Sequence, residues 1–127
     1  MSSKQIVSTD RAPKAIGPYS QAVRAAGFVF LSGQIPLDPA TGELVSGDIA
    51  KETQRVMHNL EAVLTAAGTS FDKVVRATIY LTDLADFAKV NEVYGACFPK
   101  DPPARATVQV AALPKGARVE IDLVAVE

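Results

Sequence analysis

The stretch Arg118–Val126 reads RVEIDLVAV, and its alternating pattern decides the architecture of the chain. Successive residues of a strand point to opposite faces of a sheet. One face of the strand predicted here is wholly apolar: Val119, Ile121, Leu123 and Ala125. Val124 and Val126 continue the opposite face with apolar residues as well. We therefore expect both faces of this last strand to be buried.

Hydrophobic patterns elsewhere predict five further strands and two helices. The strands are expected at residues 4–8, 21–26, 28–32, 74–82 and 106–112, and the helices at residues 48–68 and 83–98. The first helix begins at the N-cap Asp48, ends at Gly68 and has one apolar or small stripe: Ile49, Thr53, Val56, Leu60, Val63 and Ala67. The inner stripe of the second helix consists of Phe87, Val90, Val93, Tyr94 and Cys97.

The element order βββαβαββ is an α+β pattern, with one mixed sheet of about six strands and two helices on one face. Two helices cover only one face of such a sheet, so the other apolar face needs a second protein surface. We therefore expect an obligate homo-oligomer in which sheet faces pack against each other.

Length and composition limit the class of protein. The 127 residues fit a single domain, 1–127. With 13 basic and 14 acidic residues and no run of like charges, the sequence argues against nucleic acid as a partner. One cysteine, Cys97, and one histidine, His58, exclude an internal disulfide and a Cys/His zinc site within one chain. No run of about 18 apolar residues indicates a membrane span, so we expect a cytoplasmic protein.

Two charged residues on the last two predicted strands are the best candidates for chemistry. Arg105 follows Pro102-Pro103-Ala104 at the start of a strand, and Glu120 lies on the final strand. A guanidinium offers donors in a rigid fork that matches a carboxylate, so Arg105 is suited to a small anionic ligand. Glu120 is suited to handling a water molecule beside it. Taken alone, the two residues are more typical of a structural cross-strand or intersubunit ion pair than of a catalytic pair.

Six segments together resemble the Rid/YjgF family of reactive-intermediate deaminases, in its archetypal RidA subgroup. They are Gly17–Ala22 (GPYSQA), Ser32–Pro36 (SGQIP), Val90-Asn91, Pro103–Arg105 (PAR), Ala112–Gly116 (ALPKG) and Val119–Ile121 (VEI). The resemblance covers essentially the whole chain.

The resemblance implies a chorismate-mutase-like fold assembled as a homotrimer, with the sheets forming a central barrel and the helices outside. It implies clefts between subunits that hydrolyse imines and enamines, such as 2-iminobutanoate, 2-iminopropanoate and 2-aminoacrylate, to 2-keto acids and ammonia. The partner is then a small imino or keto acid, and no cofactor and no metal are needed.

The resemblance also implies roles for individual residues. Arg105 matches the arginine that grips the substrate carboxylate, and Glu120 matches the acid that positions or activates water. We expect Arg105 to favour the ionised form of Glu120 until a substrate carboxylate neutralises the guanidinium. Further substrate-binding positions are Tyr19, Ser32 and Asn91, with Gly33 and Thr107 contributing main-chain groups. Tyr19, Ser32 and Asn91 are equally suited to structural roles, as a barrel cap, a backbone-bonded hydroxyl and a loop stabiliser.

Two other functions remain open. Animal-type relatives are described as translation inhibitors with ribonuclease activity, and Gln109–Gly116 looks like that subgroup. The dispersed basic residues argue against this RNA-directed function. A non-catalytic module that binds a keto acid through Arg105 is the other alternative. Glu120 argues against it, because a carboxylate receptor gains nothing from a nearby acidic residue.

Overall fold

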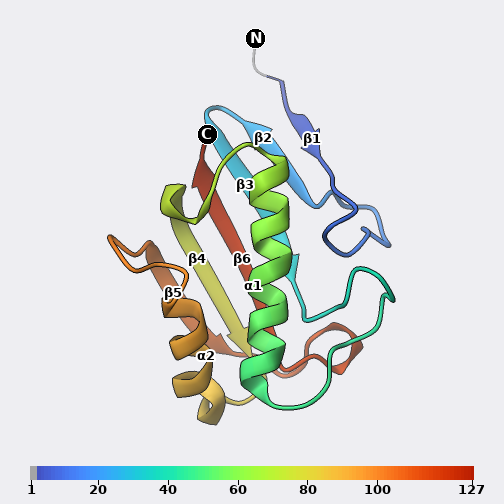
Figure 1. The fold of residues 1–127 in the computed structure, drawn as a ribbon, viewed down its shortest axis with the longest axis vertical. Helices are drawn as coiled ribbons and strands as arrows, with labels where there is room; N and C mark the ends of the chain where they lie inside the picture. The colour runs from blue at the N-terminus through green and yellow to red at the C-terminus, as the bar shows by residue number, and fades with distance from the viewer. Residues whose placement is uncertain (1–2) are drawn as a thin grey trace.

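In the computed structural model, residues 3–127 are described, so the first two residues of the predicted domain lie outside it. The described residues form a six-stranded sheet with two α-helices on one face (Figure 1). The strands are β1 (Gln5–Val7), β2 (Ala22–Ala25), β3 (Phe28–Gln34), β4 (Val74–Leu81), β5 (Ala104–Gln109) and β6 (Val119–Val126). The helices are α1 (Ile49–Ala66) and α2 (Phe87–Gly95). The predicted order βββαβαββ is confirmed.

β6 lies in the middle of the sheet, whose strand order is β1-β2-β3-β6-β4-β5. β4 and β5 pair in parallel, and the other neighbouring strands pair antiparallel. The apolar face predicted for the last strand is buried under the helices: Val119, Ile121, Leu123 and Ala125 are at most 1% exposed. This strand therefore carries much of the core, as its sequence predicts.

Helix α1 crosses the middle of the sheet (Figure 1) and begins and ends as predicted. The Asp48 side chain accepts a hydrogen bond from the Lys51 backbone N–H at 2.8 Å. At the other end Gly68 adopts φ +79°, and Thr69 N–H donates to the Leu64 carbonyl at 3.0 Å, which ends the helix in a left-handed turn. Every residue of the predicted apolar stripe is buried.

The second helix is shorter than predicted. Residues 84–86 form a 3₁₀ turn, η2, and α2 spans only Phe87–Gly95 instead of residues 83–98. The Asp83 side chain accepts a hydrogen bond from Ala85 N–H at 2.9 Å, and such a local bond competes with regular helix. On the predicted inner stripe, Val90 and Tyr94 are buried. Phe87, Val93 and Cys97 are partly buried and pack against the core.

Two strand boundaries also differ from the prediction. β3 runs on to Gln34, with an irregular register between Leu31 and Gln34. β5 covers Ala104–Gln109 rather than residues 106–112, because its parallel pairing with β4 starts where Ala104 meets Arg76. In an edge strand the ladder to its single neighbour, rather than the hydrophobic alternation, sets where the strand begins.

The face of the sheet away from the helices exposes large apolar side chains. Phe28 and Phe30 on β3 are 40% and 47% exposed, and Val108 on β5 is 41% exposed. Phe28 and Phe30 lie opposite Val126 and Val124 of β6, so these residues form one continuous apolar strip. A homo-oligomer in which sheet faces pack together would cover this strip, and this assembly stays a prediction. Among the described helices, neither has the length and apolar character needed to cross a membrane.

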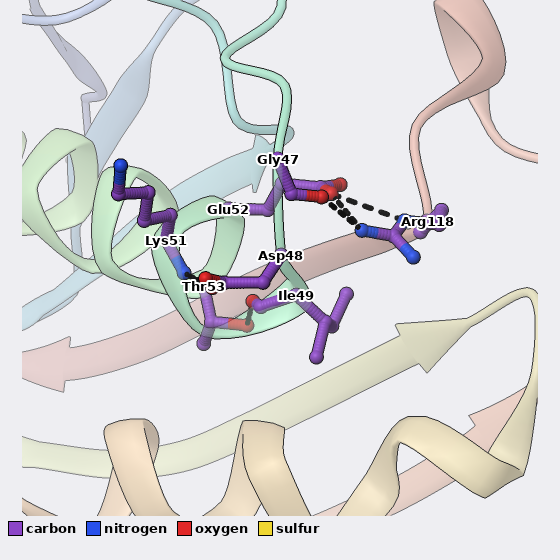
Figure 2. A network of polar contacts seen from close by, with 7 residues as sticks. All are labelled: Gly47, Asp48, Ile49, Lys51, Glu52, Thr53 and Arg118. Atoms are coloured by element: carbon purple, nitrogen blue, oxygen red, sulfur yellow. Dashed lines mark hydrogen bonds and ion pairs between the residues drawn. The ribbon is translucent and has the colours of Figure 1, made fainter.

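An ion pair between the buried Glu52 and the partly exposed Arg118 joins the start of α1 to the start of β6 (Figure 2). The Glu52 side chain is 8% exposed and accepts hydrogen bonds from Nε (3.0 Å) and Nη2 of Arg118. Arg118 Nη2 also donates to the Gly47 carbonyl at 3.0 Å. The pair therefore fixes the chain immediately before β6 against the first turn of α1.

Glu52→Ala should lower the free energy of unfolding by about 1.5–3 kcal/mol, the range for hydrogen bonds to a charged group, because Arg118 loses its carboxylate partner. Lys51→Ala, an exposed position on the same turn, is the matched control and should change it by no more than about 0.5 kcal/mol. Urea denaturation at one fixed protein concentration measures both variants. Equal losses would contradict the structural role of the pair.

Candidate active site

A cavity at the end of β3 gathers four of the predicted site residues. It has a volume of about 390 Å³ and is lined by Tyr19, Ser32, Gly33 and Glu120. The rest of its lining is mostly apolar, with one lysine: Pro13, Ile16, Gln34, Ile35, Leu37, Pro114 and Lys115. The antiparallel pairing of β3 with both β2 and β6 brings the loops that precede β2 and β6 to this end of the sheet.

Glu120 packs directly against the backbone of Gly33. A Cβ atom on residue 33 would overlap Oε2 of Glu120 and would lie 2.9 Å from its Cδ atom. A side chain at residue 33 would therefore force the end of the Glu120 side chain to shift. The irregular register of β3 falls at the same place, between Leu31 and Gln34.

The pKa of Glu120 is raised above its ordinary value, first because the carboxyl is partly buried and second because Asp122 is nearby. Burial disfavours the charged form of an acid, and a second carboxylate does the same. Arg105 of the same chain does not contribute to this shift, so its expected lowering of the Glu120 pKa stays a prediction for clefts between subunits.

Ser32 and Tyr19 line the cavity from the loop side. Ser32 Oγ donates to the Ser20 carbonyl at 2.6 Å, so the hydroxyl is bonded to backbone while its oxygen stays at the cavity wall. Tyr19 is 51% exposed. Sequence reasoning missed Gln21, a buried side chain whose Nε2 donates to the carbonyl of Pro13 at 2.8 Å and thereby holds one wall.

Arg105 lies on the edge strand β5, where residues of α2 hold its side chain. Its guanidinium carbon lies 5.0 Å from the ring centroid of Tyr94 and 5.5 Å from that of Phe87. Nη1 donates to Asn91 Oδ1 at 2.6 Å. Arg105, Asn91 and Tyr94 line a second hollow of about 430 Å³. The aromatic contacts and the Asn91 bond fix the direction of the guanidinium.

Thr107 stands two residues further along β5. Its hydroxyl is buried and makes no hydrogen bond to the described residues. Val110 N–H donates to the Leu81 carbonyl at 2.8 Å. Because N–H groups alternate between the two edges of a strand, those of Arg105 and Thr107 point away from β4, to the free edge of the sheet.

The predicted site residues thus fall into two groups on opposite faces of the sheet. Arg105 pairs with Ala77, which faces the helices, whereas Glu120 pairs with Tyr80, which faces away from them. Asn91 and Thr107 belong with Arg105, and Tyr19, Ser32 and Gly33 belong with Glu120. Since the sheet lies between the groups, one small ligand cannot touch both within a single chain.

Known proteins resemble this chain over almost its whole length. A family model described as Endoribonuclease L-PSP matches residues 9–127. Protein DfrA of Myxococcus xanthus is 63% identical over 97% of this chain and 95% of its own. A 2-iminobutanoate/2-iminopropanoate deaminase of Bos taurus is 51% identical over 98% of this chain and 90% of its own. The chain belongs to the Rid/YjgF family.

A solved relative extends the likeness to three dimensions. The crystal structure of E. coli TdcF with bound serine superposes with a TM-score of 0.92 at 44% identity, covering 97% of this chain and 98% of that one. The chorismate-mutase-like fold implied by the Rid/YjgF resemblance is therefore confirmed. The roles of the individual site residues are taken up below as proposals.

The contact between Gly33 and Glu120 in this Rid/YjgF protein can be tested by a double-mutant cycle. Gly33→Ala should destabilise the fold by about 1–3 kcal/mol, because the added methyl group overpacks the Glu120 side chain. In a Glu120→Ala background the same substitution should cost much less, because the methyl group has room. Denaturant unfolding of all four proteins measures the coupling. The same cost in both backgrounds would show that Glu120 does not fill this space.

The raised pKa of Glu120 gives the stability of the protein a pH dependence of definite sign. A folded-state pKa above the unfolded value adds stability below the unfolded pKa, and this contribution is lost as the pH rises through the folded-state pKa. Glu120→Gln removes the titrating proton, so the variant should gain stability relative to wild type as the pH rises from about 4 to about 8. Thermal melts across this range measure the difference, and parallel curves would contradict it.

Proposed function

We propose that this protein is a 2-iminobutanoate/2-iminopropanoate deaminase, which hydrolyses imines and enamines such as 2-aminoacrylate to 2-keto acids and ammonia. In this proposal Arg105 binds the substrate carboxylate and Glu120 activates the water. The observation that carries it is the placement of an oriented arginine and a carboxyl group of raised pKa at two accessible hollows of a Rid/YjgF chain. The deaminase name of the relative that is 51% identical supports the same activity.

The guanidinium of Arg105 is prepared for a carboxylate before any ligand arrives. Asn91 occupies one of its donors, and two aromatic rings hold its plane, so the remaining donors face a defined direction. A charge-assisted bond of this kind is worth about 1.5–3 kcal/mol. The outward N–H of Thr107 adds a donor at the same edge. The serine in the E. coli TdcF structure is a ligand of the same size and carries a carboxylate.

Glu120 is suited to handle protons in a mostly apolar cavity. A carboxyl group with a raised pKa is a better base toward water than an ordinary one, and general base catalysis contributes roughly 10²- to 10⁴-fold. The apolar walls, including Ile16 and Leu37, suit an aliphatic substrate side chain. Hydrolysis of an imine needs only this proton transfer and the alignment of water with the electrophilic carbon, so no cofactor is required.

The two groups can act on one substrate if a second copy supplies the missing half. We infer a homotrimer in which the β5 edge of one copy, with Arg105 and Thr107, meets the Glu120 cavity of its neighbour. The exposed strip formed by Phe28, Phe30 and their neighbours on β6 gives the sheet faces an apolar surface to bury. A closed ring then has one cleft at each interface.

The decay of an imino acid tests the proposed activity. An amino-acid oxidase generates the imino acid in place, semicarbazide traps what remains, and wild type should accelerate its loss. Glu120→Ala should lower kcat/KM by about 10²- to 10⁴-fold and Arg105→Ala by about 10- to 100-fold. Glu61→Ala and Lys51→Ala, exposed positions on α1, are matched controls. No acceleration by wild type across several imino acids would reject the deaminase.

Mixing the two inactive variants tests which chains supply the residues. In a randomly mixed ring of three, Arg105→Ala and Glu120→Ala subunits together should restore about a quarter of the wild-type rate, because one interface of each mixed ring is intact. Native mass spectrometry verifies that mixed rings form. Mixed rings without activity would place both residues in clefts of a single chain. Cleavage of RNA by the same preparation, with a steep loss as salt rises, would favour the ribonuclease alternative.

A further inference from the structure

Glu120 belongs to a polar cluster on the face of the sheet away from the helices. Glu120 and Asp122 occupy alternate positions of β6, so both side chains lie on that face. Across the ladder, Tyr80 of β4 stands opposite Glu120, and its hydroxyl donates to Asp122 Oδ2 at 3.0 Å. The phenol therefore reaches diagonally past Glu120 and fixes the neighbouring carboxylate.

We propose that Asp122, held in place by Tyr80, is a positioning residue that keeps a proton on Glu120 when an enamine is bound and its carboxylate neutralises Arg105. This inference rests on the proposed deaminase and extends it to a second carboxylate. Two carboxylates on one face of a strand resist being ionised together, because each charge disfavours the other. The direction of the Glu120 pKa, raised by burial and then by Asp122, agrees with this arrangement.

Among the charged groups of the same chain near Glu120, Asp122 has the main effect on its protonation. On β6 the nearest charged group is Asp122, and on β4 the facing titratable group is the Tyr80 hydroxyl. The three β3 residues in the Glu120 cavity, Ser32, Gly33 and Gln34, are uncharged, and Tyr19 lines the cavity from the loop before β2. Lys115, before β6, lines the same cavity, and within residues 3–127 it makes no ion pair with Glu120. In the proposed trimer Arg105 of a second copy also approaches, and a substrate carboxylate then neutralises it.

A protonated Glu120 can donate a proton to an enamine and regain one from water within the same reaction. Its carboxyl proton passes to the terminal carbon, the C=C electron pair forms that C–H bond, and a C=N bond forms at carbon 2. Water then bonds to carbon 2 as the second electron pair of the C=N bond returns to nitrogen, and the added water gives one proton to the Glu120 carboxylate. In the resulting carbinolamine the hydroxyl proton moves to nitrogen, the C–N bond breaks, and ammonia leaves as the C=O bond forms. Glu120 ends with the proton it had at the start.

Asp122→Asn tests the proposal, because it removes the charge and keeps the size and the acceptor for Tyr80. Carbon-detected NMR follows the Glu120 carboxyl without substrate, assigned by its loss in Glu120→Gln. We expect the apparent pKa of Glu120 to fall in Asp122→Asn. It should fall by a smaller amount in Tyr80→Phe, which leaves the charge but frees Asp122 to turn away. Asp72→Asn, exposed on the 3₁₀ turn Phe71–Lys73, is the matched control and should leave the curve unchanged.

The pH profile of kcat/KM supplies the second measurement. Its acidic limb for an imino acid, set by ionisation of Glu120, should move to lower pH in Asp122→Asn by the same amount as the NMR titration. An unchanged Glu120 titration overturns the proposal whether or not the protein is a deaminase. A shifted NMR titration of Glu120 together with an unchanged acidic limb of the kcat/KM profile also overturns the proposal, because the proton on Glu120 then does not govern turnover. An inactive wild type with a shifted titration contradicts the proposed function instead.

Discussion

The alternation of β6 is the constraint on which the other features of this protein depend. One face of the strand carries apolar residues that α1 covers, and the same alternation sends Glu120 and Asp122 to the opposite face. A register shift of one residue would bury both carboxylates in the core and expose Ile121. The hydrophobic effect that selects the fold therefore also selects the face on which the acid stands.

The position of Glu120 is unfavourable for stability and favourable for chemistry. Its carboxyl is partly buried, lies near a second carboxylate and packs closely on Gly33, where an added Cβ atom would force the Glu120 side chain to shift. Burial and the second carboxylate both raise the free energy of the ionised form in the folded state. Groups with perturbed pKa values cluster at functional sites, which supports the role proposed for Glu120. The charge of Arg105 is stabilised instead of penalised. Two aromatic rings and Asn91 contact its guanidinium, and among the described residues it makes no ion pair with a carboxylate.

Sequence patterns predicted most of the fold, because long periodic segments carry the signal. The ends of α1 followed from Asp48 and Gly68, whose local bonding is independent of the rest of the chain. The patterns failed where tertiary pairing decides, as at β5, whose start depends on its ladder with β4. The same limit applies to the site. Motifs identified Arg105 and Glu120, but only the register of β4 with both neighbours reveals that they lie on opposite faces.

The loops that wall the Glu120 cavity are positioned by polar side chains rooted in regular elements. Asn59, buried in α1, donates to the Leu37 carbonyl at 2.9 Å, and Gln21 holds the Pro13 carbonyl from the start of β2. Arg118 ties the chain after Lys115 to Glu52 of α1. Buried amides and ion pairs add little net stability over apolar packing, but they tolerate only one arrangement, because any other leaves polar groups unsatisfied. Loops held in this way keep a small apolar cavity open beside a carboxyl group, and that requirement explains why polar side chains lie within an otherwise apolar core.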